Sequence, residues 1–336
     1  MKKIVDCMVI GGGPAGIAAA LEIDKAGGSV VLLEREGRLG GILKQCIHDG
    51  FGLEKFERQL SGPEYAQVYL DRLDKSRIDV HLKTFVTGLE KTDSGFKAVI
   101  VDRQHGMSEI RSKTVVLATG CRERTGKQIF INGERPSGVY TAGTAQYLVN
   151  IDGVLPCERC VILGSGDIGL IMARRLTLEG AQVVGVFEAK AEPSGLKRNI
   201  QQCLNDFDIP LNLSKTVTRL AGNKRLTGVY VADLDEQGKV DSETEQFIAC
   251  DGLILSVGLI PENEIAEKLG IQLDATTKGP IVDKQMMTSV EGVFCCGNAL
   301  HVFDLVDHVS DSGEIAGSAA LSYILLSKDE SQGGRT

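Results

Sequence analysis

The sequence predicts an α/β fold in which one strand–helix–strand unit occurs twice. Apolar runs of strand length alternate with helical stretches, as in sheets whose strands are joined by helices. Two of the strand-to-helix junctions are rich in glycine, and each copy closes with an apolar strand that ends in glycine. Glycine accounts for 40 of the 336 residues, against a usual share of roughly 7%. Because these glycines follow no collagen-like period, we expect them in turns and close backbone contacts.

The first copy begins near the amino terminus. An apolar run over residues 4–10 has the length of a buried strand and leads into Gly11-Gly12-Gly13-Pro14-Ala15-Gly16. A helical stretch follows to about residue 26, and a second apolar run over 30–33 ends at Glu34. The closing strand ends in Ala118-Thr119-Gly120, and a turn signal at 93–95 predicts short antiparallel strands before it.

The second copy repeats this pattern in the middle of the chain. An apolar run over 160–163 leads into Gly164-Ser165-Gly166-Asp167-Ile168-Gly169, a helical stretch to about residue 179, and a strand that ends at Glu188. The closing strand, 253–258, ends in Ser256-Val257-Gly258, and a turn signal lies at 236–238. From first glycine to acid the spacing is 23 residues in the first copy and 24 in the second.

The glycines of such a unit have separate physical roles. The first permits the tight turn, the second lets the backbone approach a pyrophosphate, and the third lets the helix pack on the strand. The phosphates then lie at the positive end of the helix, and the acid accepts hydrogen bonds from ribose hydroxyls, a role we assign to Glu34 and Glu188. The sequence therefore predicts two Rossmann-like dinucleotide-binding domains, each with a central parallel sheet and a small antiparallel β-meander.

Over residues 3–325 the chain resembles the pyridine nucleotide-disulfide oxidoreductase superfamily, flavoproteins in which an NAD(P) domain interrupts an FAD domain. The first glycine loop with Glu34, the closing motif at 118–120 and a late motif over 288–298 carry this resemblance. It implies an FAD-binding domain made of residues 1–124 and 259–336 and an NAD(P)-binding domain made of residues 125–258. At Asn298 the superfamily usually has aspartate, so the charge of one FAD contact is missing.

The same resemblance assigns cofactor contacts residue by residue. The superfamily's last helix directs its amino terminus at the flavin, which implies that His301 or the backbone around Asp304 tunes the flavin. The residues expected to bind FAD are Gly11, Gly13, Pro14, Ala15, Gly16, Glu34, Arg35, Gly40, Gly41, Ile42, Ala118, Thr119, Gly120, Gly297, Asn298, His301 and Asp304; those expected to bind NAD(P) are Gly164, Gly166, Asp167, Ile168, Gly169, Glu188, Val257 and Gly258.

A closer resemblance is carried by residues 40–53, 121–124 and 297–302. These segments look like the NAD(P)/FAD-dependent oxidoreductases that accompany glycerol-3-phosphate dehydrogenase-type flavoproteins, and like the NADH-oxidising subunits of dye-linked proline dehydrogenases and opine oxidases. The resemblance implies hydride transfer between NAD(P)H and FAD, with electrons passed to a partner flavoprotein or another acceptor. A second hypothesis is a non-autonomous FAD-holding subunit of a dehydrogenase complex. Superfamily members are often dimers, so a homodimer is also implied.

The cysteines leave a third hypothesis open. Disulfide reductases of the superfamily carry C-x-x-x-x-C after the Gly-Gly pair, and those positions are Leu43 and His48 here. Cys46 lies between them, so a single-cysteine thiol, peroxide or disulfide reductase requires a lowered pKa at Cys46, with His48 as the neighbour that lowers it. We expect Cys157 and Cys160 to be packed in the sheet, and we expect no metal site.

Charge and composition limit the partners. The net charge of −8 disfavours binding to nucleic acid and to anionic membrane surfaces. No stretch reaches the roughly 20 apolar residues of a membrane span. Nine cysteines without a framework spacing suit a reducing compartment, so we expect a cytoplasmic protein. A carboxylate at Glu188 favours NADH over NADPH, although Lys190 is close by.

Overall fold

Residues 4–333 are described by the computed structural model, and the chain divides into two units at residues 122/123 and 259/260. Unit 1 contains residues 1–122 and 260–336, and unit 2 contains residues 123–259. The boundaries expected from the sequence, 124/125 and 258/259, lie within two residues of these. The chain passes between the units along β7 (Cys121–Glu123) and β17 (Leu259–Pro261), which pair with each other.

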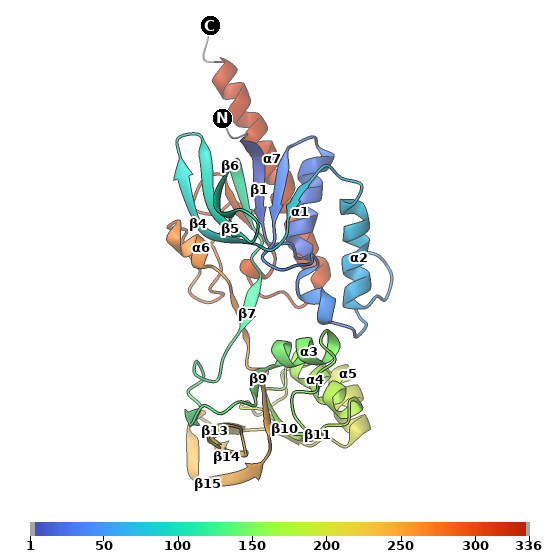
Figure 1. Ribbon diagram of the computed structural model, residues 1–336. Helices are drawn as coiled ribbons and strands as arrows, with labels where there is room; N and C mark the ends of the chain where they lie inside the picture. Colours follow the sequence, from blue (N-terminus) through green and yellow to red (C-terminus); the bar gives the residue numbers. More distant parts are fainter. Residues whose placement is uncertain (1–3, 334–336) are drawn as a thin grey trace. The chain divides into compact units, whose positions relative to one another are not determined.

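Unit 1 is built on a mixed seven-stranded sheet (Figure 1). Strands β3, β2, β1, β6 and β18 run parallel, and β6, β5 and β4 form an antiparallel meander. The strands are β1 (Val5–Ile10), β2 (Val30–Leu33), β3 (Asp79–His81), β4 (Thr84–Thr92), β5 (Gly95–Asp102), β6 (Gly106–Leu117) and β18 (Val293–Cys295). The helices are α1 (Pro14–Lys25), η1 (Gly41–Gln45), α2 (Gly62–Leu73), α6 (Glu264–Lys268), η3 (Gly297–Ala299) and α7 (Val306–Gly333).

Side chains of the central strand alternate between two cores. Cys7 and Val9 pack with α1, α2 and α7 on one face of the sheet, whereas Met8 and Ile10 pack with the meander and α6 on the other. Helices α1 and α7 lie side by side (Figure 1), and small residues allow their close approach. A Cβ added at Gly313 would lie 2.8 Å from the carbonyl carbon of Ala15. The start of α7 is thereby fixed beside the first glycine loop.

Unit 2 repeats the layered arrangement. Its first sheet, β12-β11-β10-β16-β9, is entirely parallel, and a second sheet, β15-β14-β13-β8, contains the meander. The strands are β8 (Asn132–Gly133), β9 (Val139–Thr141), β10 (Arg159–Leu163), β11 (Gln182–Phe187), β12 (Leu211–Asn212), β13 (Lys215–Ala221), β14 (Gly228–Leu234), β15 (Val240–Ala249) and β16 (Gly252–Leu255); the helices are α3 (Ala142–Asn150), α4 (Asp167–Leu178), α5 (Lys197–Cys203) and η2 (Asn205–Phe207).

The alternation of β1 recurs in β10. Cys160 and Ile162 face α3, α4 and α5, while Val161 and Leu163 face the meander. The predicted α/β class with two parallel sheets and two meanders is therefore confirmed. Within residues 4–333, none of the helices combines the length and the apolar character that crossing a membrane requires.

Candidate nucleotide-binding sites

The first glycine of each loop forms the turn at the carboxyl end of the first strand. Gly11 and Gly164 have φ values of +113° and +102°, which L side chains rarely adopt. A Cβ on Gly11 would lie 2.7 Å from the carbonyl carbon of Ala118, and a Cβ on Gly164 would lie 2.7 Å from that of Ser256. In both units the loop therefore packs against the backbone of the closing strand, as the repeated pattern predicts.

The second and third glycines divide the remaining roles. A Cβ on Gly13 would find its nearest neighbour 3.8 Å away, and one on Gly166 would find it 4.0 Å away, so the second glycine of each loop faces open space. The third glycine is tightly packed: a Cβ on Gly16 would lie 3.0 Å from the carbonyl carbon of Gly11, and one on Gly169 would lie 2.5 Å from the Gly164 oxygen. This cradle fits a pyrophosphate approaching the second glycine.

Each loop opens directly into a helix whose first turn has no side-chain cap. The N-cap residues of α1 and α4 are Gly13 and Gly166, which have no side chain to accept from the first N–H groups. Pro14 occupies the first turn of α1, where its lack of an N–H removes no helical hydrogen bond. Backbone N–H groups and the positive end of the helix dipole remain available to an anion at both helix starts.

The two acids bind the loop backbone in the same way. Glu34 accepts from the Gly12 N–H at 2.7 Å and from the Glu36 N–H at 2.8 Å. Glu188 accepts from the Ser165 N–H at 2.9 Å and from the Lys190 N–H at 3.0 Å. Both carboxylates are buried, with 7% of their surface exposed. Each acid is thus held at the edge of its glycine loop, where the spacing placed it.

Glu188 remains ionised despite its burial. Burial by itself would raise its pKa, but hydrogen bonds from the Ser165 hydroxyl and from the backbone N–H groups of Lys190 and Ser165 oppose this effect. The pKa of Glu188 therefore lies below its ordinary value. Sequence reasoning missed Ser165, because the second position of the loop is variable in the fingerprint and its side chain carries no signal by itself.

The other residues expected at the NAD(P) loop lie around it in unit 2. Asp167 accepts from the Leu196 N–H at 2.8 Å and from the Asn199 side-chain amide at 2.7 Å, so it fastens the segment after β11 to α4. Ile168 packs against the helical side of the core. Val257 borders the meander core, and Gly258 has a φ of +105°.

The residues expected after Glu34 surround the loop of unit 1. Gly40 donates its N–H to the Gly12 carbonyl at 2.8 Å, and Gly41 lies against Gly13. Arg35 pairs with Glu262 at 3.2 Å, and the Thr119 hydroxyl donates to the Glu262 carbonyl at 2.7 Å. In the same region Ala15 and Ala118 are buried, Ile42 is exposed, and Gly120 has a positive φ with open space around it.

The late motif forms η3 and the approach to α7. The Gly297 N–H donates to the Ser312 hydroxyl at 2.9 Å, and the Asn298 side-chain oxygen accepts from the Phe303 N–H at 3.1 Å. The His301 ring packs on the Phe303 ring with 3.9 Å between centroids. Asp304 is exposed and precedes α7 by two residues, so its backbone lies at the start of that helix.

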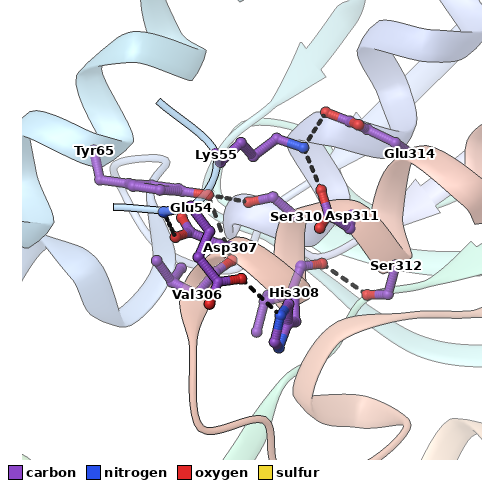
Figure 2. A network of polar contacts seen from close by, with 11 residues as sticks. Glu54, Lys55, Tyr65, Val306, Asp307, His308, Ser310, Asp311, Ser312 and Glu314 are labelled. Carbon is purple, nitrogen blue, oxygen red and sulfur yellow. Dashed lines mark hydrogen bonds and ion pairs between the residues drawn. The ribbon is translucent and has the colours of Figure 1, made fainter. Parts of the chain in front are cut away.

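A polar network at the start of α7 was not predicted from the sequence (Figure 2). Asp307 is 4% exposed; one of its oxygens accepts from the Glu54 N–H at 3.1 Å, and the other has no partner among the described residues. His308 pairs with the Glu54 carboxylate at 3.1 Å, and Lys55 binds Glu314 at 2.9 Å and also Asp311. Residues 54 and 55 are thereby fastened to α7, and no local pattern signals contacts between segments so far apart in the chain.

The thiol hypothesis lacks the chemical condition it required. The Cys46 thiol lies 3.4 Å from the Ile42 carbonyl, and burial raises its pKa to about 12. The His48 ring packs on Phe51 at 4.9 Å, and its Nδ1 lies 3.0 Å from the Asp49 carbonyl. At neutral pH Cys46 is a protonated thiol, which is a poor nucleophile.

The remaining cysteines are reduced and mostly buried. Cys157 and Cys160 hydrogen bond to each other, and both are buried, Cys160 within β10. Among residues 4–333, the side chains of His, Cys, Asp and Glu form no cluster suited to a metal ion.

Comparisons with known proteins extend these observations. A family model described as pyridine nucleotide-disulphide oxidoreductase matches residues 5–313. Hydrogen cyanide synthase subunit HcnB of Pseudomonas protegens is 28% identical over 293 residues, which cover 81% of this chain and 60% of HcnB. An opine oxidase subunit of Agrobacterium tumefaciens is 24% identical over 344 residues, which cover 97% of this chain and 67% of that protein. The chain thus spans about three-fifths to two-thirds of the length of these curated relatives.

Solved structures share the whole fold. Thioredoxin reductase of Lactococcus lactis matches with a TM-score of 0.78 at 22% sequence identity, covering 96% of this chain and 99% of the reductase. The family whose model matches uses FAD and NAD(P)H, and the two glycine cradles fit these dinucleotides, so the cofactor prediction is confirmed at this level. Because the match extends over most of the sequence, the chain belongs to the pyridine nucleotide-disulphide oxidoreductase family.

Proposed function

We propose that the chain is an FAD-dependent oxidoreductase that takes a hydride from NAD(P)H, with NADH preferred, and passes electrons to a partner flavoprotein or another acceptor. The paired glycine loops carry this proposal, because each unit has an open second glycine, an uncapped helix start and a buried acid. Two dinucleotide sites in one chain suit exchange of a hydride between two cofactors. FAD, when bound, supplies a hydride acceptor that can release its electrons later.

Unit 1 is the proposed FAD domain. Its loop would hold the pyrophosphate at the start of α1, and Glu34 would accept from a ribose hydroxyl. Gly40 and Gly41 lie against this loop, so the chain around the pyrophosphate is more enclosed than in unit 2. Asn298 is already held by Phe303, and its side-chain oxygen retains a second lone pair for the cofactor.

Unit 2 is the proposed NADH domain. Glu188 stays charged at neutral pH, so it would accept a hydrogen bond from the 2′-hydroxyl of NADH and repel the 2′-phosphate of NADPH. Gly166 leaves room for the pyrophosphate at the start of α4. Side chains need to supply little acid–base chemistry, because a hydride transfer between two stacked cofactors depends on their positions.

The proposed acceptor is a partner protein of the same complex. HcnB and the opine oxidase relative are both named as subunits, and this chain matches only part of each. A role as an FAD-holding subunit of a dehydrogenase complex is the second candidate. The same relatives favour it, and it differs from the first in whether NADH reduces the flavin directly.

The deciding experiment is an anaerobic titration of the purified protein with NADH and, in parallel, with NADPH, followed by flavin absorbance. We expect a yellow protein that NADH bleaches at about one equivalent. A yellow protein that neither nucleotide bleaches would support the subunit role. A colourless protein that takes up no FAD would refute the assignment of unit 1.

A further inference from the structure

Ser165 connects the second glycine loop to the acid beyond it. The residue is fully buried, and its hydroxyl donates to Oε2 of Glu188 at 2.6 Å. The same hydroxyl accepts from the Ser194 N–H at 2.9 Å, and the backbone N–H of Ser165 also donates to Oε2 at 2.9 Å. One serine therefore holds the acid from two sides while it fastens the segment that follows β11.

The loop of unit 1 has no such hydroxyl. Gly12 occupies the position of Ser165, and a Cβ there would lie 2.9 Å from Oε2 of Glu34 and would clash with Leu39. In unit 1 the side chain of Leu39 fills this space. The hydroxyl contact is thus a property of unit 2 rather than of glycine loops in general.

The hydrogen bonds leave Glu188 little freedom to rotate. Oε2 accepts from the Ser165 N–H, from the Ser165 hydroxyl and, at 3.4 Å, from the Ser194 hydroxyl, so its lone pairs are fully used. Oε1 accepts from the Lys190 N–H alone and keeps one lone pair. Asp167 anchors the same segment through the Leu196 N–H. The carboxylate can accept one further donor, and it can move away only by breaking charge-assisted bonds.

We propose that Ser165 is a specificity-determining positioning residue, which holds Glu188 where Oε1 accepts a ribose 2′-hydroxyl and where a 2′-phosphate meets a fixed negative charge. This inference rests on the proposed function, which assigns a nicotinamide nucleotide to unit 2. A 2′-hydroxyl donates one hydrogen bond, which matches the single lone pair left on Oε1. A 2′-phosphate donates none at neutral pH, and Glu188 cannot turn away from it without losing the Ser165 bonds. The cation of the exposed Lys190 does not replace this selection, because the fixed carboxylate is closer to the loop.

The test compares two fragments that differ only in the 2′-phosphate. Binding of 5′-AMP and of adenosine 2′,5′-bisphosphate to the FAD-loaded protein is measured by calorimetry for wild type, Ser165→Ala and Glu188→Gln. We expect wild type to prefer 5′-AMP and Ser165→Ala to reduce that preference about tenfold, the effect of one hydrogen bond to a charged group. The ratio of NADH to NADPH kcat/KM should fall by a similar factor. A merely structural role would weaken both fragments equally and leave the ratio unchanged.

Ser137→Ala is the matched control, because its exposed hydroxyl in the same unit donates to the Lys224 carbonyl at 2.9 Å, outside this network. An unchanged ratio in Ser165→Ala, together with a reduced ratio in Glu188→Gln, would overturn the inference and leave the nucleotide assignment intact. If wild type binds neither fragment, both the assignment of unit 2 and the role of Ser165 are wrong.

Discussion

The first glycine of each loop offers a test that separates the two cofactor sites. Gly11→Ala and Gly164→Ala change equivalent positions in unit 1 and unit 2. Gly27 and Gly180 provide matched controls, because each follows the first helix of its unit with φ of +85° or +94° and with no atom within 4 Å of an added Cβ. The control substitutions therefore impose the same backbone strain without a steric clash.

The magnitude follows from these geometries. An alanine in the left-handed region costs about 1–2 kcal/mol. At Gly11 and Gly164 the added Cβ would also lie 2.7 Å from a backbone carbonyl carbon, closer than the 3.0 Å that real Cβ atoms respect. Overpacking of this kind costs a further 1–3 kcal/mol or so, and the backbone must shift to relieve it. We therefore expect the loop variants to be about 2–5 kcal/mol less stable locally and the controls about 1–2.

The assay measures flavin per chain and the NADH concentration that half-bleaches the flavin. Gly11→Ala should lose its yellow colour on gel filtration, whereas Gly164→Ala should stay yellow and require at least about tenfold more NADH, because the N–H groups facing the pyrophosphate are displaced. Gly27→Ala and Gly180→Ala should match wild type in both readouts. If Gly164→Ala bleaches as readily as Gly180→Ala, the turn at Gly164 is not where the nucleotide binds.

Three further outcomes are expected. Asp6 is partly desolvated, which raises its pKa, but Lys113 and Ser29 bring the pKa down from 3.8 to about 2; this lowering corresponds to about 2 kcal/mol, or about 1 after solvent screening. Stability from a depressed carboxyl pKa is present above pH 3.8 and lost towards pH 2, so Asp6→Asn should lower the urea midpoint at pH 7 and match wild type near pH 2. Cys46→Ser should leave NADH oxidation within about twofold for every acceptor, since the thiol has a pKa of about 12; a large loss with peroxide or disulfide acceptors alone would favour the thiol hypothesis. Lys55→Met should speed amide exchange over residues 51–60 in mass spectrometry, because the bridge to α7 is lost; unchanged exchange would show that the ion pairs do not restrain this segment.

The parts of the site that depend on backbone conformation could be predicted from the sequence. A glycine at a turn, a helix that starts two residues later and an acid at the end of the next strand are encoded within about 25 residues. Each local choice has one structural solution, because only glycine tolerates the φ of Gly11 and Gly164 together with their contacts.

The parts that depend on tertiary contacts could not be predicted. Asp307 meets the Glu54 backbone across 253 residues, and the Gly297 N–H meets Ser312 through the packing of α7. Cys46 and His48 show the opposite limit. Their closeness in sequence suggested a reactive pair, but the pKa of a thiol depends on burial, which sequence spacing does not report.

The one-residue difference between the two copies has a structural explanation. In unit 1, β1 and β2 pair without interruption, from Cys7 opposite Val30 to Ile10 opposite Leu33. In unit 2 the register shifts after Cys160, so that Val161 lies opposite Gly185 and one residue of β11 is left without a partner. The bulge absorbs the extra residue, and the strands end in the same register.

Both first glycines then donate to the last residue of the second strand, Gly11 to Leu33 at 2.8 Å and Gly164 to Phe187 at 2.7 Å. Since the acid follows that residue in each copy, the bulge keeps Glu188 beside its loop despite the longer spacing. An insertion that moved the acid by one residue would turn its side chain to the other face of the sheet. The insertion was therefore compatible with nucleotide binding only because the strand, and not the acid, accommodated it.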